Sequence, residues 1–365
     1  MNTDRFRSGR AASGFTLVEL LAATAAAVVV AGVALAVATH VLEQWARTGG
    51  SLVAAREAGQ ALELLERDLR SAVLARDGRV WLAATVQPDQ AGAGDIRGTA
   101  LGCWSASGQP KPGWASPGTA GSSLDLAPAS GRLEDCRFGM AGVWLRLIAQ
   151  VADDSTGPAG LAAPRAVGYQ IVRHGAGGDP GATVRYSLFR SEVRTGGADS
   201  TFATGYDVFA TAYNDPAVGG ASLADAGNLR RPRRDQLLAG NVVDFGVRFR
   251  GRDAAGVPVL LFPTGNGNLG FAATVRDGTG TCSPVLGADP ALPPVVASTH
   301  HYVWAEMSYG FPEEAEVFLR VLTEEGARQV EALEAGRLAG PTWWDLVRAH
   351  SQVFTRRVVF GGVAP

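Results

Sequence analysis

The feature that most restricts this chain is an apolar run of 25 residues, Phe15 to Thr39, in which Glu19 is the only charged residue. At about 1.5 Å per residue, a helix of that length reaches about 37 Å, and the hydrocarbon core of a bilayer is about 30 Å thick. The run therefore predicts a helix that spans a membrane. An acidic side chain at mid-membrane costs about 2.5–3.5 kcal/mol on insertion scales, so Glu19 needs a functional explanation.

A short basic stretch precedes the apolar run and predicts its orientation. This stretch contains three arginines, Arg5, Arg7 and Arg10, and only one acidic residue. Positive charges favour the cytoplasmic side, so we expect a cytoplasmic N-terminus and the rest of the chain across the membrane. A secretory signal cleaved after Ala36–Ala38 and a plain membrane anchor are the alternatives. Neither gives Glu19 a role.

The start of the run carries a specific motif. Residues Gly14 to Leu21 read GFTLVELL, which resembles the prepilin-type cleavage and methylation motif of type IV pilins and type II secretion pseudopilins. The resemblance implies that prepilin peptidase cuts between Gly14 and Phe15 on the cytoplasmic side and then methylates the new amine of Phe15. It also implies that Phe15 and Glu19 act together in assembly.

The physical chemistry of the cleaved end agrees with that role. Cleavage would leave a cationic amine on Phe15 at the start of a helix, and Glu19 lies one turn along, where the helix dipole favours an anion. In a filament, Glu19 of one subunit would neutralise the amine of its neighbour. Two charges that are costly in lipid become tolerable as a pair, and the pairing would set the axial register between subunits.

The helix is expected to continue beyond the membrane with one buried face. Apolar residues mark that face, and those from Ala58 onward recur at spacings of three or four, as one helix face requires. They are Val41, Trp45, Ala58, Leu62, Leu65, Leu69 and Val73. We therefore predict one helix over about residues 16–75, interrupted near Gly49-Gly50 and ended by Asp77-Gly78.

A second motif lies within this continuation. Residues Leu65 to Arg70 read LERDLR, which resembles a signature of J-type minor pseudopilins. From the residues themselves, the segment is interpreted as a solvated charged face beside a stripe of leucines. That interpretation places six charged residues away from the buried face. They are Glu57, Glu63, Glu66, Arg67, Asp68 and Arg70.

The rest of the chain predicts strands separated by long loops. The whole chain has 47 glycines and 19 prolines in 365 residues. Together they form a larger fraction than the roughly 12% that glycine and proline make up in average proteins. The predicted strands are Val80–Val86, Val143–Val151, Ala166–Arg173, Thr183–Ser191, Asn241–Phe249, Val257–Phe262, His301–Tyr309, Ala315–Leu322 and Gln352–Phe360. Tyr169–Arg173 and Tyr186–Arg190 are expected to form a hairpin. Two late helices are also predicted: Thr323–Arg337, with Thr323 as N-cap and Val330 and Leu333 facing inward, and Pro341–His350.

These elements predict an α+β fold in which a long N-terminal membrane-spanning helix packs on a mainly antiparallel sheet, as in type IV pilins. The expected parts are a leader over 1–14, a transmembrane half of the helix over 15–39, its amphipathic continuation over 40–76, and a β-rich head over 77–365. The end of the chain, FLRVLTEEGARQVEAL followed by TWWDLVRAHSQVFTRRVVF, also resembles the Verru_Chthon cassette protein C family, a prepilin-like group.

Several signals that can mark enzymes have simpler interpretations here. Gly265–Gly270 matches G-x-G-x-x-G, but no helical pattern follows it, so a turn is favoured over a dinucleotide site. His300 and His301 have no partner residues at metal-ligand spacing. Asp345 and His350 lack a nucleophile elbow. We therefore expect neither an enzyme nor a bound cofactor.

Calcium and disulfide sites are weaker hypotheses. Acidic loop residues such as Asp153, Asp154 and Asp207 do not have EF-hand spacing. An oxidising compartment would permit a Cys103–Cys136 disulfide, although Cys282 offers competing pairings. A net charge of −2 gives no indication of nucleic-acid binding.

The resemblance implies a structural role. We expect a minor pilin-like subunit of a type II secretion or type IV pilus-like filament or its tip, single-pass in the inner membrane, with a periplasmic or extracellular head. Its partners would be prepilin peptidase and other pilin or pseudopilin subunits. The alternative is a binding or adhesion module displayed on the same anchor, with Trp104 and Trp114 as candidate contacts. Trp343 and Trp344 are interpreted as core residues.

Overall fold

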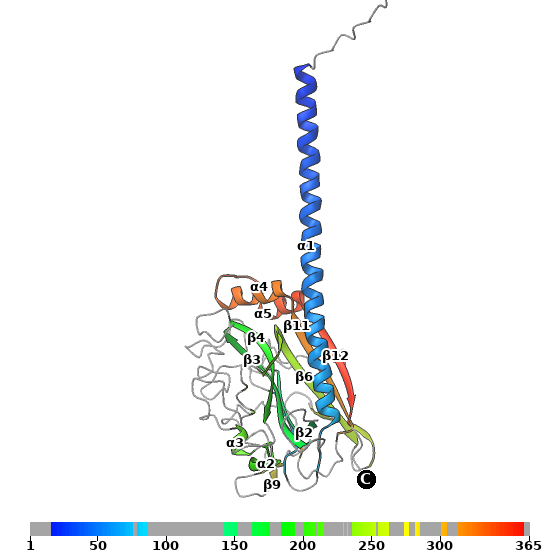
Figure 1. The fold of residues 1–365 in the computed structure, drawn as a ribbon, viewed down its shortest axis with the longest axis vertical. Coiled ribbons are helices and arrows are strands. Elements are labelled where there is room, and N and C mark those ends of the chain that lie inside the picture. Colours follow the sequence, from blue (N-terminus) through cyan, green and yellow to red (C-terminus); the bar gives the residue numbers. More distant parts are fainter. Residues whose placement is uncertain are drawn as a thin grey trace, which may run out of the picture. The chain divides into compact units, whose positions relative to one another are not determined.

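The computed structural model describes residues 16–75, 79–86, 142–151, 163–175, 184–193, 201–208, 210–214, 229, 232, 236–252, 255–262, 274–276, 282–284, 301–304 and 312–360. Contacts divide the chain into two units, Met1–Gly49 and Gly50–Pro365. The first unit contributes the N-terminal part of helix α1, and the second contributes the rest of α1 with all the strands (Figure 1).

Helix α1 extends from Leu17 to Arg70. Gly49 and Gly50 are helical, so the predicted interruption at this pair is wrong. A glycine inside a helix costs only about 1 kcal/mol relative to alanine, which is too little to end a helix by itself. The helix also ends earlier than predicted.

The early end of α1 has a hydrogen-bonding cause. The backbone nitrogen of Gln150 donates to the carbonyl oxygen of Ser71 at 2.8 Å, and the nitrogen of Val73 donates to the carbonyl oxygen of Ile148 at 2.8 Å. Ala72 and Ala149 form an isolated antiparallel bridge. The chain therefore exchanges helical partners for strand partners directly after Arg70.

The larger sheet of the second unit has six antiparallel strands in the order β10-β1-β2-β3-β4-β5. Their bounds are β1 Leu82–Val86, β2 Val143–Val151, β3 Ala163–Gly175, β4 Val184–Val193, β5 Leu237–Gly240 and β10 His301–Trp304. Tyr169 is paired with Arg190, and Arg173 with Tyr186. The predicted hairpin is therefore confirmed, and the structure supplies its register.

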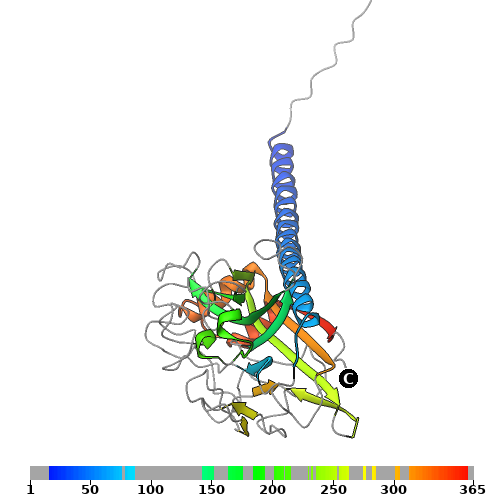
Figure 2. The same cartoon turned by 60° about the horizontal axis from the view of Figure 1, so that its bottom comes forward.

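The second sheet has four antiparallel strands in the order β12-β11-β6-β7. Its strands are β6 Val242–Arg252, β7 Pro258–Phe262, β11 Glu314–Leu322 and β12 Ser351–Val359. The β6–β7 hairpin is seen at the lower right of Figure 2 in yellow-green. A third sheet pairs β8 (Thr274–Arg276) with β9 (Cys282–Pro284). All nine predicted strands are present, most with boundaries shifted by a few residues. The part of the predicted His301–Tyr309 strand that follows Trp304 lies outside the described residues. The short strands β5, β8 and β9 were not predicted.

Helix α4 (Glu324–Glu334) confirms the predicted start at Thr323. The Thr323 hydroxyl oxygen accepts a hydrogen bond from the backbone nitrogen of Gly326 at 3.2 Å, which satisfies one of the open donors of the first turn. Val330 and Leu333 are buried, as predicted.

Helix α5 (Trp343–His350) begins two residues later than predicted, because Thr342 is its N-cap. Thr342 and Asp345 form a reciprocal capping box. Trp343 is buried, and its indole nitrogen donates to Glu334 at 3.0 Å, so its interpretation as a core residue is confirmed. Two shorter helices, α2 (Thr201–Thr204) and α3 (Thr211–Asn214), lie beside the six-stranded sheet.

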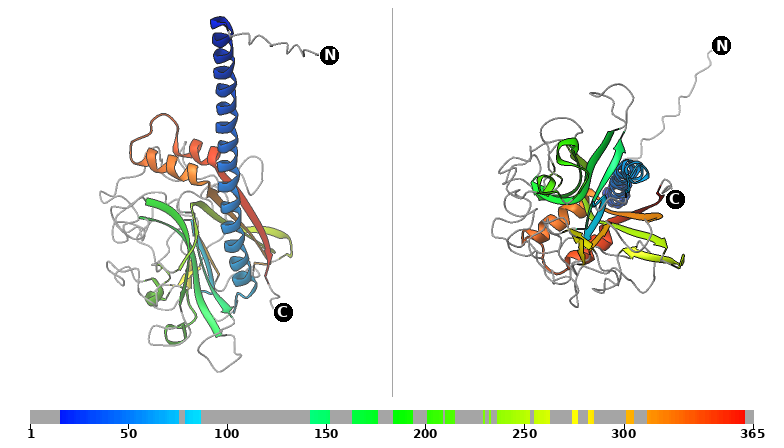
Figure 3. Two further views of the ribbon diagram at one scale, coloured as in Figure 1. Left: turned by 45° about the horizontal axis from the view of Figure 1, so that its top comes forward. Right: turned by 90° about the horizontal axis from the view of Figure 1, so that it is seen from below.

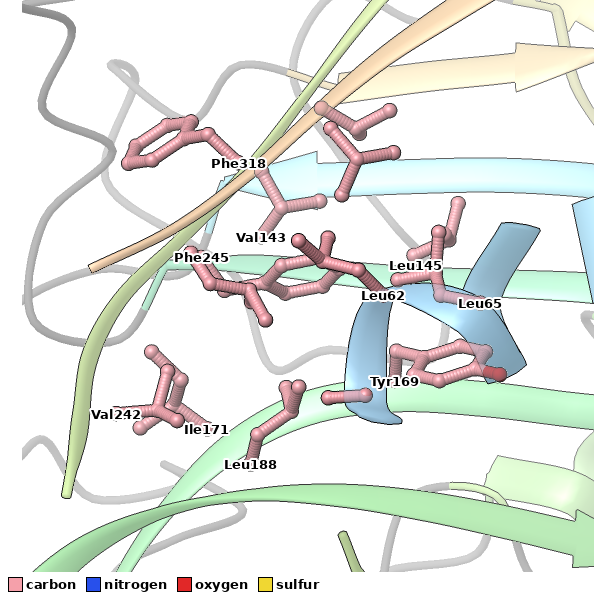
Figure 4. Close-up of a cluster of buried hydrophobic side chains, with 14 of the residues drawn as sticks. Leu62, Leu65, Val143, Leu145, Tyr169, Ile171, Leu188, Val242, Phe245 and Phe318 are labelled. Atoms are coloured by element: carbon pink, nitrogen blue, oxygen red, sulfur yellow. The ribbon is translucent and has the colours of Figure 1, made fainter. Parts of the chain in front are cut away.

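The main core lies where the C-terminal part of α1 packs on both larger sheets (Figure 3). Figure 4 shows Leu62 and Leu65 of α1 among Leu145 and Tyr169 of one sheet and Phe245 of the other. Full burial of each leucine contributes about 1.5–3 kcal/mol. The buried residues of α1 are Ala54, Ala58, Ala61, Leu62, Leu65, Asp68 and Leu69.

A smaller cluster covers the opposite face of the six-stranded sheet. Gly168 makes this packing close, because a Cβ atom there would lie 2.8 Å from Oγ of Ser191 and 3.5 Å from the carbonyl oxygen of Leu229. That carbonyl accepts hydrogen bonds from Gln170 and from Ser191. The predicted α+β class with antiparallel sheets is therefore confirmed.

Candidate functional site

The part of α1 in the first unit is the candidate membrane segment. Leu17–Leu42 is 26 residues long, and every residue of it is exposed. Among the residues that the structure describes, this is the one helix long and apolar enough to cross a membrane. Length and composition carry this conclusion, and a secretory signal near the N-terminus would have the same properties.

Glu19 begins this segment as part of a helix cap. Its Oε2 atom accepts hydrogen bonds from the backbone nitrogen and the hydroxyl of Thr16, both at 3.0 Å. The Thr16 hydroxyl accepts from the nitrogen of Glu19 at 3.3 Å in return. Thr16 and Glu19 thus form a capping box. An anion at this end is also favoured by the helix dipole, so one carboxylate satisfies the first turn and carries the only charge of the segment.

Other residues singled out in the sequence lie partly outside the described ranges. Gly14 and Phe15 precede the first described residue, and Cys103 and Cys136 lie in the undescribed stretch between β1 and β2. The proposed cleavage site and disulfide therefore stay predictions. Gly265–Gly270 also lies outside, and the next described element is strand β8.

The motif LERDLR holds a correction. Asp68 was predicted on a solvated face, but its side chain is completely buried. Its Oδ2 atom accepts a hydrogen bond from the hydroxyl of Tyr169 at 2.6 Å and another from Nε of Arg190 at 2.6 Å. Buried carboxylates need such partners, and the two strands of the predicted hairpin supply them.

The hydrogen bonds continue from Asp68 across the two strands. Arg190 also pairs with Glu192, and Glu192 pairs with Arg165. Burial raises the pKa of Tyr169 well above its ordinary value, and the charge of Asp68 adds to that rise. Burial alone lowers the pKa of Arg190, but Tyr169 and Asp68 outweigh it and raise that pKa above its ordinary value. The group is therefore a fixed ion-pair network, which we call the Asp68 network.

The same turn of α1 reaches the other sheet through Glu66. Its Oε2 atom lies 3.0 Å from Nε of Arg356 in β12, and its Oε1 atom lies 2.6 Å from Nη2 of Arg70. At about 100° per residue, Glu66 and Asp68 project about 160° apart around the helix. LERDLR therefore binds one sheet on each side, with Leu65 and Leu69 in the core between them.

The remaining candidates have structural surroundings. Asp345 is occupied by the capping box of α5, and His301 begins strand β10. Asp207 is described, but no group of three or more His, Cys, Asp or Glu side chains that could hold a metal ion occurs among the described residues. Trp344 packs against the core beside Trp343, with the ring centroids 5.0 Å apart.

The Asp68 network could have been found from two signals in the sequence. Asp68 follows Leu65 by three residues, which places it at the border of the leucine stripe. Tyr169 and Arg190 lie in the two segments that were predicted to form a hairpin. The error was to assign charged residues to solvent by type, although acids at such borders are buried when a cation meets them.

Comparisons of the chain with protein-family models, with curated proteins and with solved structures gave no match. The resemblance of GFTLVELL to prepilin motifs therefore rests on the residues themselves. A function for this site is a proposal from those residues and from the geometry described above.

Proposed function

We propose that this protein is a minor pilin-like or pseudopilin-like subunit. It is inserted in the inner membrane by Leu17–Leu42 and incorporated into a filament, or the tip of a filament, of type II secretion or type IV pilus type. In this proposal the N-terminus is cytoplasmic, prepilin peptidase cuts after Gly14 and methylates Phe15, and the protein acts by assembly without catalysis.

The observation that carries the proposal is the position of Glu19. Glu19 is a lone carboxylate in an apolar segment, and it lies four residues after Phe15 of the Gly14-Phe15 pair. It lies in the first turn of α1, where it accepts hydrogen bonds from Thr16. In a simple anchor this charge would serve only as a helix cap, whereas in a filament subunit it would also be a partner for the amine of the neighbouring subunit.

The second unit also suits a filament subunit. The C-terminal part of α1 is buried on one face by two antiparallel sheets. The opposite face stays exposed along the helix, from Leu52 and Val53 to Arg67 and Arg70. A helix with one face fixed in a head and another open to partners is the arrangement that pilin-like assembly requires.

Mass spectrometry of the mature protein tests the processing step. Protein purified from the cell envelope should begin at Phe15, with one methyl group on its amine. A bulky residue in place of Gly14 should block cutting, whereas Gly14→Ala should be cut slowly. A mature N-terminus at Thr39 would instead identify a secretory signal and refute the proposal.

A further inference from the structure

Three acidic residues of α1 border its buried face, and each contacts a different part of the head. Oε2 of Glu57 accepts a hydrogen bond from the backbone nitrogen of Gly240 at 3.0 Å. Glu66 pairs with Arg356, and Asp68 with Arg190. The first and third contacts reach the six-stranded sheet and the second reaches the four-stranded sheet.

The apolar face of α1 opposes a shift along the helix axis only in part. Moved by four residues, Ala54 would occupy the place of Ala58 and Leu65 that of Leu69, whereas Ala58 and Ala61 would underfill the places of Leu62 and Leu65. Shifts of one turn, about 5 Å, are a known way for packed helices to change register. The hydrogen bonds of Ser71 and Val73 to β2 hold the chain only after the helix has ended.

Glu57 and Glu66 oppose every one-turn shift. A shift of α1 by four residues toward its C-terminal end would move Glu57 to the place of Ala61, and a shift by three would move Glu66 to the place of Leu69. A shift by four residues in the other direction would move Glu66 to the place of Leu62, and a shift by three would move Glu57 to the place of Ala54. Each of these four positions is buried in apolar surroundings, where an unpaired carboxylate is strongly disfavoured.

Asp68 supports the same register in another way. Glu57 and Glu66 disfavour the shifted registers, whereas Asp68 stabilises the observed one through its own contacts. The residues that would replace it after a one-turn shift are Leu64, Leu65, Ser71 and Ala72, and none of them carries a charge. In the observed register it meets both Tyr169 and Arg190. Its second oxygen, Oδ1, is buried without a hydrogen-bond donor among the described residues. A polar group that is kept despite incomplete hydrogen bonding is typical of a determinant of register.

We infer that Glu57, Glu66 and Asp68 are positioning residues that hold α1 in a single register within the head. They thereby fix which stripe of the helix points away from it. That outward stripe is Leu52, Val53, Arg56, Gln60, Glu63, Arg67 and Arg70. Only its use by neighbouring subunits rests on the proposed function.

Distances between two spin labels test the inference on the full chain in detergent micelles. One label replaces Glu63 of α1 and the other replaces Arg328 of α4, and both side chains are exposed. Because Thr323, directly before α4, lies beside Gly50, movement of α1 along its axis changes this distance. Labelling through a ketone-bearing amino acid avoids the native cysteines.

The decisive variant is Glu57→Ala/Glu66→Ala/Asp68→Leu. The wild type should give one narrow distance, and the variant should add a second population displaced by about 5 Å, one helical turn. The control Arg252→Ala/Glu313→Ala removes an exposed ion pair and should keep the single distance. A variant that keeps only the wild-type distance would overturn the inference, since packing would then set the register.

A second variant covers the case in which the decisive variant does not fold. If the decisive variant does not unfold cooperatively, Glu57→Gln/Glu66→Gln/Asp68→Asn keeps the side-chain shapes without the charges and is judged by the same distances. The measurement uses the isolated chain, so its failure leaves the proposed assembly role intact. Failure of the mass-spectrometric test would conversely leave the register measurement valid.

Discussion

Nε of Arg190 lies 2.6 Å from Oδ2 of Asp68, although 122 residues separate them in the chain. Asp68 belongs to the helix that continues from the candidate membrane segment, and Arg190 belongs to the fourth strand of the head. Because both side chains are largely removed from solvent, their attraction is weakly screened. The pair therefore joins the helix to the sheet at a point where neither residue can replace its partner by water.

Removing one member of this pair should destabilise the head. Arg190→Met leaves the Asp68 carboxylate buried with only Tyr169 as a donor, and breaking a buried ion pair in this way costs about 3–5 kcal/mol. Chemical denaturation of the full chain in detergent measures the loss. Arg328→Met removes an exposed member of an i,i+3 pair and is the control, with an expected change within about 0.5 kcal/mol. Equal stabilities of the two variants would show that the Asp68 network does not support the fold.

The same network predicts a dependence of stability on pH. Burial raises the pKa of Glu192, but Arg190 and Arg165 outweigh that effect and leave it below its ordinary value. A depressed folded-state pKa stabilises the fold above the unfolded value, about 4.3 for glutamate, and this stabilisation is lost as the pH falls through the folded-state pKa.

Glu192→Gln tests this dependence. Unfolding midpoints measured from pH 6 down to about pH 3, on either side of the ordinary glutamate value, should fall less steeply in the variant than in the wild type. Glu63→Gln, at an exposed position of α1, should keep the wild-type slope. If both variants follow the wild type, the Glu192 ion pairs add no stability.

How far the sequence predicts this fold depends on the element. Alternating apolar residues in Val143–Val151 and in the Tyr169–Arg190 hairpin predict strands because one face of each is buried by α1. Strands β5, β8 and β9 have only three or four residues, too few for a periodic signal. The sequence places Asp68 at the border of the leucine stripe and Arg190 in the predicted hairpin, but the contact between them, across 122 residues, is made only in the folded chain.

Replacing Gly326 by alanine should destabilise the fold, whereas the same replacement at an ordinary helical glycine stabilises it. A Cβ atom at Gly326 would collide with the Cβ atom of His350 and lie 3.1 Å from the His350 carbonyl oxygen. Gly326→Ala should therefore separate α4 from α5 and lower the unfolding midpoint.

Glycine 59 provides the matched control in α1. A Cβ atom there meets no described atom within 4 Å. Gly59→Ala should thus raise stability by about 0.5–1 kcal/mol, the helix-propensity difference. Thermal unfolding of both variants gives the signs, and stabilisation by Gly326→Ala would contradict the observed α4–α5 contact.

Replacing Glu19 tests the assembly role most directly. Glu19→Ala or Glu19→Leu removes a carboxylate that is costly in lipid, so membrane insertion should be retained or improved. Cleavage after Gly14 should continue, because that glycine is unchanged. Crosslinking to partner subunits and filament or secretion function should be lost, since the amine of a neighbouring Phe15 would then have no counter-ion. Glu19→Asp should be intermediate, because it keeps the charge and shortens its reach.

Thr16→Ala separates the two roles that Glu19 has in the proposal. It removes the hydroxyl that exchanges hydrogen bonds with Glu19 but keeps the carboxylate. If Glu19 acts by pairing with a neighbouring subunit, Thr16→Ala should assemble far better than Glu19→Ala. If helix capping were the whole role of Glu19, Thr16→Ala should reproduce a large part of the Glu19→Ala defect, reduced only by the backbone nitrogen of residue 16 that still donates to Glu19. A Glu19→Ala subunit that crosslinks and functions like the wild type would show that helix packing or the head sets the register between subunits, and that the charge pair is not used.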